Sequence, residues 1–349
     1  MSLALTHEVL RLSLRDPFLI ARADHGGGHA VTTVVVELRD ERHPGLVGIG
    51  EGYPDAYYGE APATMAAVWP ILLEAVGEPR LDATGLATAA AAMDDAIGHH
   101  GAAKCALDIA LHDLAGKVAG RPVYQLLGLS RDLPPTDFSL GIDAPEVVAE
   151  RARRAAGFPS LKIKVGGPDD LATLEAVRAV YGGPIRVDAN TAWTPADAER
   201  LLPELVRLGV ELIEQPFPAR RLDQLARLQE ISPLPLVADE SCVTIDDLDA
   251  LVGVVAGVNV KLAKCGGVGA AARMLQRARD LGFRTFLGCM EETSVAIAAS
   301  AAVASLAEWV DLDGNLLIAD DPFEGLELDG ASRWLLPDRP GLGVRRRTG

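Results

Sequence analysis

The spacing of apolar residues divides the chain into stretches of different character. Residues 1 to about 60 contain three runs with strand character, at 10–22, 31–40 and 46–52, and a glycine-rich loop joins the first two. From about 61 to 128 the apolar residues recur at helical spacing, and this pattern stops near a Gly-Arg-Pro sequence. These features predict an N-terminal α+β domain over residues 1–128.

Residues 129–321 instead alternate short apolar runs with helical segments, a repetition typical of a parallel sheet. Eight runs separated by seven helical segments predict a closed (β/α)7β barrel of the TIM type, with an open doubly wound sheet as the alternative. The tail, 322–349, does not continue the alternation of apolar runs and helical segments. We expect it to pack back on the N-terminal part and complete that domain. The predicted strands are 136–142, 161–165, 185–189, 210–216, 234–240, 257–262, 283–288 and 308–313.

Composition and charge narrow the function classes. The chain has 349 residues and a formal net charge of −16, which makes nucleic acid and anionic membrane surfaces poor partners and suits a protein that binds a cation. Its four cysteines form no CxxC pair, so we expect free thiols and a cytoplasmic location. The N-terminus lacks a signal-peptide pattern, and the Ala-rich stretch 294–307, interrupted by serine, predicts a buried helix instead of a membrane span.

Acidic residues end three successive predicted barrel strands: Asp188, Glu214 and Asp239. The carboxyl ends of all strands in a parallel barrel surround one mouth, where active sites lie. Carboxylates gathered there repel one another unless a cation lies among them. Three carboxylate ligands suit a hard octahedral ion, so we expect Mg²⁺, with Mn²⁺ as the alternative. A simpler interpretation is that each carboxylate caps the helix that follows its strand.

Lysines lie on the two predicted strands that flank the acidic ones. Lys162 and Lys164 precede the triad by one strand, and Lys261 follows it by one strand. A lysine that is partly desolvated near another cation has a lowered pKa and can act as a general base. A base on one face and an acid on the other could invert a carbon next to a carboxylate, while a divalent ion stabilises the enediolate. Alternatively, the lysines only neutralise the acids, or the same groups assist an elimination or cycloisomerisation.

These segments resemble motifs of the enolase superfamily, and specifically of its muconate-lactonizing subgroup. LKIKVG looks like the KxK motif of that family, VNVKLAKCGG like its second lysine motif, and VDANTAW, IEQPF and VADES like its three metal-ligand motifs. AAKCALDIALHDLAGKVAGRPVYQLLG looks like the segment that enters the barrel. The resemblance covers essentially the whole chain and implies a barrel capped by the N-terminal domain.

Carried over residue by residue, the resemblance makes Asp188, Glu214 and Asp239 the Mg²⁺ ligands. It implies that Lys164 is one acid/base and Lys261 the other.

It also implies that Lys162 helps to hold the substrate carboxylate and depresses the pKa of Lys164. Strand parity favours Lys261 over Lys264 as the second acid/base. Lys261 shares the inward face with Asn259, whereas Lys264 falls in the following loop.

The segment VDLDG matches the Asp-x-Asp motif of dipeptide epimerases of the L-Ala-D/L-Glu type. The resemblance therefore implies that Asp311 and Asp313 hold the α-ammonium group of a dipeptide. The alternative is that one aspartate caps a turn and the other is solvated. N-acylamino acid racemase, o-succinylbenzoate synthase and muconate cycloisomerase are the other candidate activities, although their substrates lack a free α-ammonium.

Glu291 stands where this family usually has an apolar residue. An inward-facing Glu291 would favour a polar or cationic substrate residue. Parity argues against that orientation, because Glu292 shares a face with Gly288 and Met290 and Glu291 does not.

Residues 20–31 resemble the mobile lid loop of the family, and 53–60 resemble its second lid segment. In the first segment, Arg22 lies where the resemblance implies a contact with the substrate carboxylate. His25 and His29 flank three glycines, which will not hold the helix that an HxxxH zinc site needs.

Other classes compete with this interpretation. Gly267, Gly269 and Ala272 fit the G-x-G-x-x-A pattern of dinucleotide-binding loops, but no acidic residue ends a strand about 20 residues later. A metal-dependent binding protein would keep the carboxylates but would not need two flanking lysines. Homo-oligomers are frequent in the family, so we expect one here.

Overall fold

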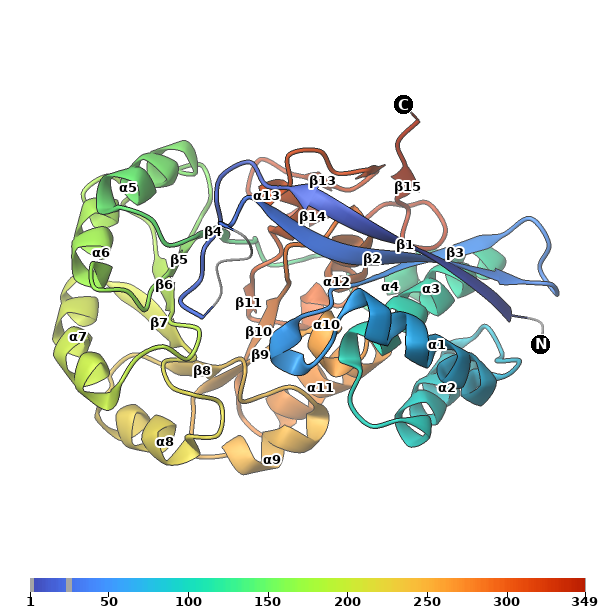
Figure 1. Cartoon of the computed structure of the whole chain (residues 1–349), viewed down its shortest axis with the longest axis horizontal. Coiled ribbons are helices and arrows are strands. Elements are labelled where there is room, and N and C mark those ends of the chain that lie inside the picture. Colours follow the sequence, from blue (N-terminus) through green and yellow to red (C-terminus); the bar gives the residue numbers. More distant parts are fainter. Residues whose placement is uncertain (1–2, 23–26, 349) are drawn as a thin grey trace.

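The computed structural model describes residues 3–22 and 27–348, and Figure 1 shows a barrel beside a smaller domain of one sheet and several helices. Residues 23–26 of the predicted lid loop, including His25, lie outside the described residues.

The smaller domain contains an antiparallel sheet of β1 (Leu3–Ser13), β2 (Ala30–Asp40) and β3 (Val47–Gly52), in that order. The first strand differs from its predicted range of 10–22, because it begins at Leu3 and ends at Ser13. All of β1 pairs with β2, from Leu3 opposite Asp40 to Ser13 opposite Ala30. Beyond it, Pro17 has no backbone N–H to donate to a strand ladder.

The predicted helical region contains α1 (Pro62–Val76), α2 (Ala83–Ala96), α3 (Gly101–Ala119) and the short α4 (Val123–Leu126), with η1 (Ala56–Tyr58) before them. Helix α3 packs closely on β3. A Cβ on Gly50 would collide with the carbonyl oxygen of Ala106 in α3, so this contact requires glycine. The centre of α3 is buried, because the helix lies between the small sheet and the barrel.

Eight parallel strands form the barrel, and their order follows the chain without a reversal. A parallel bridge between Thr136 and Val310 joins the first and last strands, and Asp137 N donates to Val310 O at 3.1 Å. This closure confirms the predicted barrel over an open doubly wound sheet. The strands are β4 (Phe138–Leu140), β5 (Leu161–Lys164), β6 (Ile185–Asp188), β7 (Val210–Glu214), β8 (Leu236–Ala238), β9 (Gly257–Lys261), β10 (Arg284–Gly288) and β11 (Trp309–Val310).

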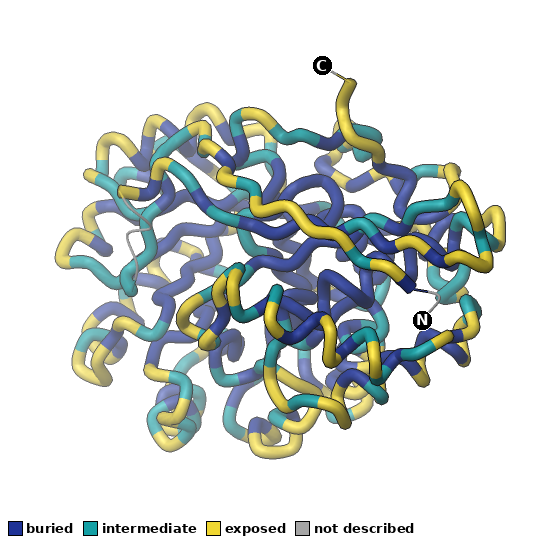
Figure 2. Tube along the Cα trace, turned by 45° about the vertical axis from the view of Figure 1, so that its right-hand side comes forward, coloured by how far each residue is buried: buried dark blue, intermediate teal, exposed yellow. Residues whose placement is uncertain are grey.

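Helices connect successive barrel strands, and their outer faces are exposed while the strands are buried (Figure 2). The last strand is followed only by the four-residue α13 (Gly314–Leu317), which gives the (β/α)7β pattern. The connecting helices are α5 (Pro145–Arg154), α6 (Asp170–Arg178), α7 (Pro195–Arg207), α8 (Leu222–Ile231), η2 (Ile245–Asp247) with α9 (Leu248–Leu251), α10 (Leu262–Cys265) with α11 (Val268–Asp280), and α12 (Ser294–Ala301) with η3 (Ala304–Leu306).

The Ala-rich helix α12 is buried along its whole length, as its sequence predicts. Nowhere in residues 3–22 and 27–348 is a helix long and apolar enough to cross a membrane. All four cysteines are free thiols. Burial raises the pKa of Cys242 and of Cys265 to about 12, which keeps both thiols protonated and unreactive.

The tail touches both parts of the molecule through short strand pairs, β12 (Phe323–Glu324) with β15 (Arg345–Arg346) and β13 (Glu327–Leu328) with β14 (Trp334–Leu335). Arg346 pairs with Glu8 of β1, whereas the Trp334 indole donates to Leu312 O of the barrel at 2.8 Å. We propose the division into residues 1–128, completed by 322–349, and residues 129–321. The Arg346 contact supports placing the tail with the smaller domain.

Candidate active site

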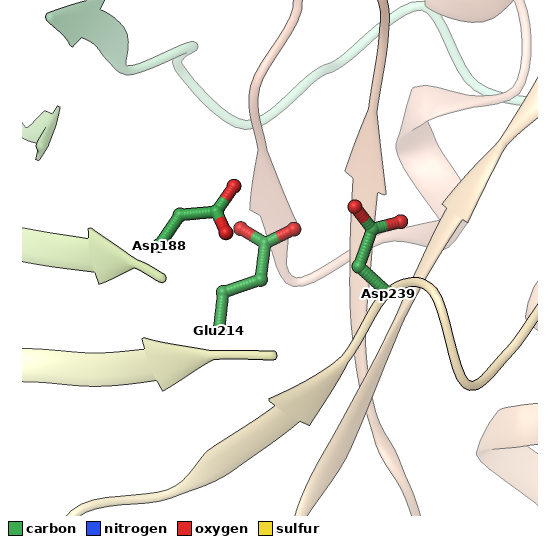
Figure 3. Close-up of side chains that lie close together, drawn as sticks. All are labelled: Asp188, Glu214 and Asp239. Carbon is green, nitrogen blue, oxygen red and sulfur yellow. The ribbon is translucent and has the colours of Figure 1, made fainter. Parts of the chain in front are cut away.

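The three acidic residues predicted to bind a metal come together at the mouth of the barrel. Asp188 ends β6, Glu214 ends β7 and Asp239 directly follows β8, and all three are buried. Each residue offers a carboxylate oxygen within 4.8 Å of those of the other two. Figure 3 shows the three side chains turned toward a common region.

Glu214 is the least satisfied of these carboxylates. Its Oε1 accepts a hydrogen bond from Asn259 Nδ2 at 2.6 Å. Its Oε2 lies 3.4 Å from Lys162 Nζ but accepts no hydrogen bond from any described residue. Burial and the neighbouring charge of Asp188 raise the pKa of Glu214. A buried, unsatisfied oxygen among hard oxygen donors fits a divalent cation such as Mg²⁺.

Gln215 fixes the spacing between the ends of β7 and β8. Its side-chain oxygen accepts hydrogen bonds from Asp239 N at 2.9 Å and from Ser241 N at 3.0 Å. Its backbone has φ of 34°, a left-handed conformation that costs a non-glycine residue about 1–3 kcal/mol. The strained turn therefore lets one side chain hold Asp239 beside Glu214.

Two of the predicted lysines contact different ends of the triad. Lys164, from β5, donates to Asp188 Oδ2 at 2.6 Å. Lys261, from β9, donates to Asp239 Oδ2 at 2.9 Å. The strands follow the order β5 to β9, so the two ammonium groups approach the triad from opposite flanks.

The pKa of Lys261 differs from the sequence expectation of a lowered value. Burial by itself would lower this pKa, but Asp239, Glu214 and Asp188 outweigh burial and raise it. The contact between Lys261 and Asp239 also shifts the pKa of Asp239, in the opposite direction. Burial would raise its pKa, yet Lys261 and Lys264 hold it well below its usual range. The carboxylates of the protein thus favour the charged lysine.

Lys264 also contacts Asp239, and it lies in α10 instead of the predicted loop. Its ammonium group donates to Asp239 Oδ1 at 2.5 Å and to the carbonyl oxygens of Asp239, Cys242 and Asn259 at 2.7–3.0 Å. Every N–H of Lys264 therefore has an acceptor, whereas Lys261 has one acceptor among the described residues. This difference favours Lys261 as the group free to exchange a proton.

Lys162 faces the other predicted substrate-binding residues. It forms an ion pair with Asp311, which also accepts a hydrogen bond from the Ser139 hydroxyl at 3.1 Å. Asp313 accepts a hydrogen bond from Ser139 N at 2.5 Å. Burial would raise the pKa of Asp311, but Lys162 outweighs it and lowers the pKa. Burial and Asp311 raise the pKa of Asp313 to about 8, so this buried carboxyl is mostly neutral at pH 7.

Arg22 crosses from the smaller domain to the barrel. Its guanidinium pairs with Glu240, lies 3.4 Å from Asp55 and stacks 4.3 Å above the centre of the Tyr57 ring. A cavity of about 820 Å³ lies beside it, lined in part by Asp55, Tyr57 and Thr191. Arg22 therefore reaches the site, but in this structure its partners are protein groups.

Glu291 and Glu292 follow β10 and differ in burial. Glu292 is buried, and burial together with Glu51 raises its pKa to about 8. Glu291 is half-buried, and its charge adds to the pKa increase that burial causes at Tyr53 and that burial and Asp311 cause at Asp313. The Glu291 carboxylate thus lies within electrostatic reach of Asp313.

The dinucleotide alternative is wrong. Val268 N and Gly269 N, at the start of α11, donate to Asp108 Oδ2 at 2.7 and 3.3 Å. A carboxylate of the protein itself therefore fills the position that a pyrophosphate would need.

Sequence reasoning missed a polar layer beneath the triad. Arg186 donates to Asp137 Oδ2 at 2.8 Å and to Glu211 Oε2 at 2.7 Å, inside the barrel. Arg186 lies two residues before Asp188 on the same strand face, so alternation alone could have identified it. No pattern marked Asp137, because its partner is 49 residues away in the chain.

This protein is a two-domain barrel protein with an acidic site at the barrel mouth. The class is indicated by the closed barrel, the buried acidic triad and the two flanking lysines. The chain belongs to the mandelate racemase/muconate lactonizing enzyme family of the enolase superfamily. Residues 6–128 match the family model described as "Mandelate racemase / muconate lactonizing enzyme, N-terminal domain", and residues 146–348 match "Enolase C-terminal domain-like".

Several relatives are similar over nearly the whole chain. An L-Ala-D/L-Glu epimerase of Bacteroides thetaiotaomicron is 39% identical over 338 residues, covering 96% of this chain and 86% of that protein. The structure of a dipeptide epimerase from Enterococcus faecalis V583, complexed with Mg and the dipeptide L-Leu-L-Tyr, superposes with a TM-score of 0.88 at 33% identity and 99% coverage of both chains. An N-succinyl Arg/Lys racemase from Bacillus cereus has a TM-score of 0.90 at 30% identity, covering 99% of this chain and 96% of that one.

Proposed function

We propose that this protein is a Mg²⁺-dependent isomerase that epimerises a dipeptide at the α-carbon next to its free carboxylate. The contact of Lys164 and Lys261 with opposite ends of the acidic triad carries this proposal. One amine can remove the α-proton from one face, and the other can return a proton to the opposite face. The named activities of the relatives agree with this chemistry.

Asp188, Glu214 and Asp239 would hold the metal. Bound Mg²⁺ would supply positive charge that stabilises the negative charge developing on the substrate carboxylate and opposes the raised pKa of Lys261. Lys162, which is 3.4 Å from Glu214 and 3.9 Å from Asp188, is placed to hold the same carboxylate.

Asp311 and Asp313 would bind the α-ammonium group at the other end of the dipeptide. Both are buried. Asp313 accepts a hydrogen bond from the backbone N–H of Ser139 but forms no ion pair with any described residue. Arg22 remains a candidate for a substrate contact, which would require exchange of its bond to Glu240 or Asp55.

N-acylamino acid racemisation is the second candidate, because the racemase of Bacillus cereus has nearly the same fold. The substrates of o-succinylbenzoate synthase and muconate cycloisomerase likewise lack an ammonium group that Asp313 could bind. Asp313 is buried beside Asp311 and forms no ion pair with a described residue, so a substrate with a free ammonium group would stabilise its ionised form and is favoured.

The deciding experiment is a panel of L,L-dipeptides and N-succinyl amino acids incubated with the protein and Mg²⁺ in deuterated water. Epimerisation should appear as a mass increase of the dipeptides and as formation of the L,D epimer. Exchange in the acylated amino acids alone would favour the second candidate. Binding without exchange in any compound would indicate a metal-dependent binding protein.

The same panel tests the side-chain preference. We propose that Glu291 favours a polar or cationic residue in the substrate. Its half-buried carboxylate acts on Tyr53 and Asp313, which supports an orientation toward the mouth. The Glu291→Leu variant should lose its preference for lysine- or arginine-containing dipeptides over neutral ones. An unchanged ranking of kcat/KM across the panel would remove this assignment.

A further inference from the structure

Two acceptor atoms beside the triad are buried without a donor among the described residues. They are Glu240 Oε2 and Asn190 Oδ1. The side chain of Glu240 is 0% exposed, and Asn190 is 3% exposed. The two residues adjoin each other, because Asn190 Nδ2 donates to Glu240 Oε1 at 3.3 Å.

Both residues are tied to the proposed metal ligands by the backbone. Glu240 directly follows Asp239. Asn190 lies two residues after Asp188 and donates its backbone N–H to Asp188 Oδ1 at 2.9 Å. This turn has a left-handed backbone at Asn190, with φ of 41°. The strained turn keeps Asn190 next to Asp188 while its side-chain oxygen stays buried without a donor.

The other carboxylate oxygen of Glu240, Oε1, already accepts hydrogen bonds from the protein. It receives them from Arg22 and from Asn190 Nδ2. Arg22 is itself held by Asp55 and by the Tyr57 ring, so the smaller domain fixes the orientation of Glu240. This arrangement leaves Oε2 as the free acceptor.

A buried acceptor without a donor destabilises a folded protein, so we expect these two oxygens to receive a hydrogen bond in the working protein. Three carboxylates leave open positions on an octahedral ion, and Mg²⁺ usually keeps several waters there. A metal-bound water donates both hydrogens outward and needs nearby acceptors. We infer that Glu240 and Asn190 are positioning residues that accept hydrogen bonds from water on the metal held by Asp188, Glu214 and Asp239.

This inference rests on the metal site of the proposed function, and the two can be tested separately. Mn²⁺ binding can be followed by electron paramagnetic resonance of the free ion, with Mg²⁺ as a competitor and no substrate present. Glu240→Ala should weaken Mn²⁺ binding about 10- to 100-fold, as is typical when an outer hydrogen-bond partner of a metal site is lost. Asn190→Ala should weaken binding in the same direction.

Two further variants make the test specific. Glu240→Gln can keep the hydrogen bonds from Arg22 and Asn190 with its single oxygen but puts an NH2 group in place of Oε2, so it should weaken Mn²⁺ binding as Glu240→Ala does. Asp55→Asn removes the other carboxylate partner of Arg22 and should leave Mn²⁺ affinity within about twofold of the wild type. Circular dichroism and thermal unfolding would establish that each variant is folded.

The outcomes separate the inference from the proposed function. A folded Glu240→Ala protein with wild-type Mn²⁺ affinity would overturn the inference alone. A folded Glu240→Gln protein that binds Mn²⁺ as tightly as the wild type would also overturn it, since an NH2 group in place of Oε2 cannot accept a hydrogen bond from water. No Mn²⁺ or Mg²⁺ binding by the wild type would instead overturn the proposed function.

Discussion

Lys164 and Lys261 never share a partner in the triad. Lys164 Nζ lies 2.6 Å from Asp188, and Lys261 Nζ lies 2.9 Å from Asp239, with Glu214 on the strand between them. An inversion of configuration needs this separation, because each amine must face one side of the reacting carbon. Amines gathered on a single flank could not perform it.

The first prediction concerns the stereochemistry of exchange. Lys164→Met should abolish deuterium exchange at the α-carbon of one epimer of the dipeptide, and Lys261→Met should abolish it for the other. Epimerisation should fall at least about 100-fold in both, because either step alone is then blocked. Proton NMR of each pure epimer in deuterated water measures the exchange. If both variants lost deuterium exchange for the same epimer, the placement of the two lysines on opposite sides of the α-carbon would be contradicted.

The second prediction separates Lys261 from its neighbour Lys264. Lys264→Met leaves three carbonyl oxygens without their donor and should lower the free energy of unfolding by about 3–5 kcal/mol. Lys261→Met should cost much less, because Lys264 still pairs with Asp239. Urea unfolding of this matched pair without Mg²⁺ measures both values. Equal losses of stability would show that the two lysines are structurally equivalent.

The third prediction concerns metal and stability. Mg²⁺ at 100 times its Kd should raise the free energy of unfolding of the wild type by about 2.7 kcal/mol. Glu214→Gln should remove this gain. It should also leave the metal-free protein at least as stable as the wild type, since repulsion with Asp188 is relieved. Thermal unfolding with and without a chelator provides the comparison, and an undiminished response to Mg²⁺ in the variant would exclude Glu214 as a ligand.

The fourth prediction is a pH dependence set by Asp313. Its pKa is about 8 in the folded protein and about 3.9 in the unfolded chain. The folded state therefore holds this proton more tightly, so the contribution of Asp313 is full below pH 4 and is lost as the pH rises toward 8. The slope is at most about 1.4 kcal/mol per pH unit.

Asp313→Asn should remove that slope, so the variant should gain stability relative to the wild type between pH 5 and pH 8. Urea unfolding across this range without substrate or metal gives the difference. A constant difference would show that Asp313 does not titrate there. Ser139→Ala is the matched control. It keeps the backbone N–H that donates to Asp313, so its stability should show the same pH slope as the wild type.

The sequence predicted the barrel strands and the triad because both follow from local rules. Each of Asp188, Glu214 and Asp239 ends an apolar run, and parallel strands bring such ends to one mouth. Alternation also identifies which face Lys162 and Lys164 occupy. The first strand of the small domain was predicted seven residues late, since its start at Leu3 depends on pairing with Asp40.

The unpredicted features depend on partners far apart in the chain. Arg22 meets Glu240 across 218 residues, and Lys162 meets Asp311 across 149. No local pattern specifies such a pairing. Lys264 was assigned to a loop because a four-residue helix that ends at a Gly-Gly pair leaves almost no periodicity to detect.

The ion pair between Lys162 and Asp311 has a consequence for recognition. In the free protein these two groups neutralise each other within the barrel mouth. A dipeptide carries a carboxylate at one end and an ammonium at the other, so it can replace both halves of this internal bond at once. A ligand with only one terminus would leave a buried charge without its counter-ion. The pocket would therefore select for zwitterions through an exchange of partners, before any side chain is recognised.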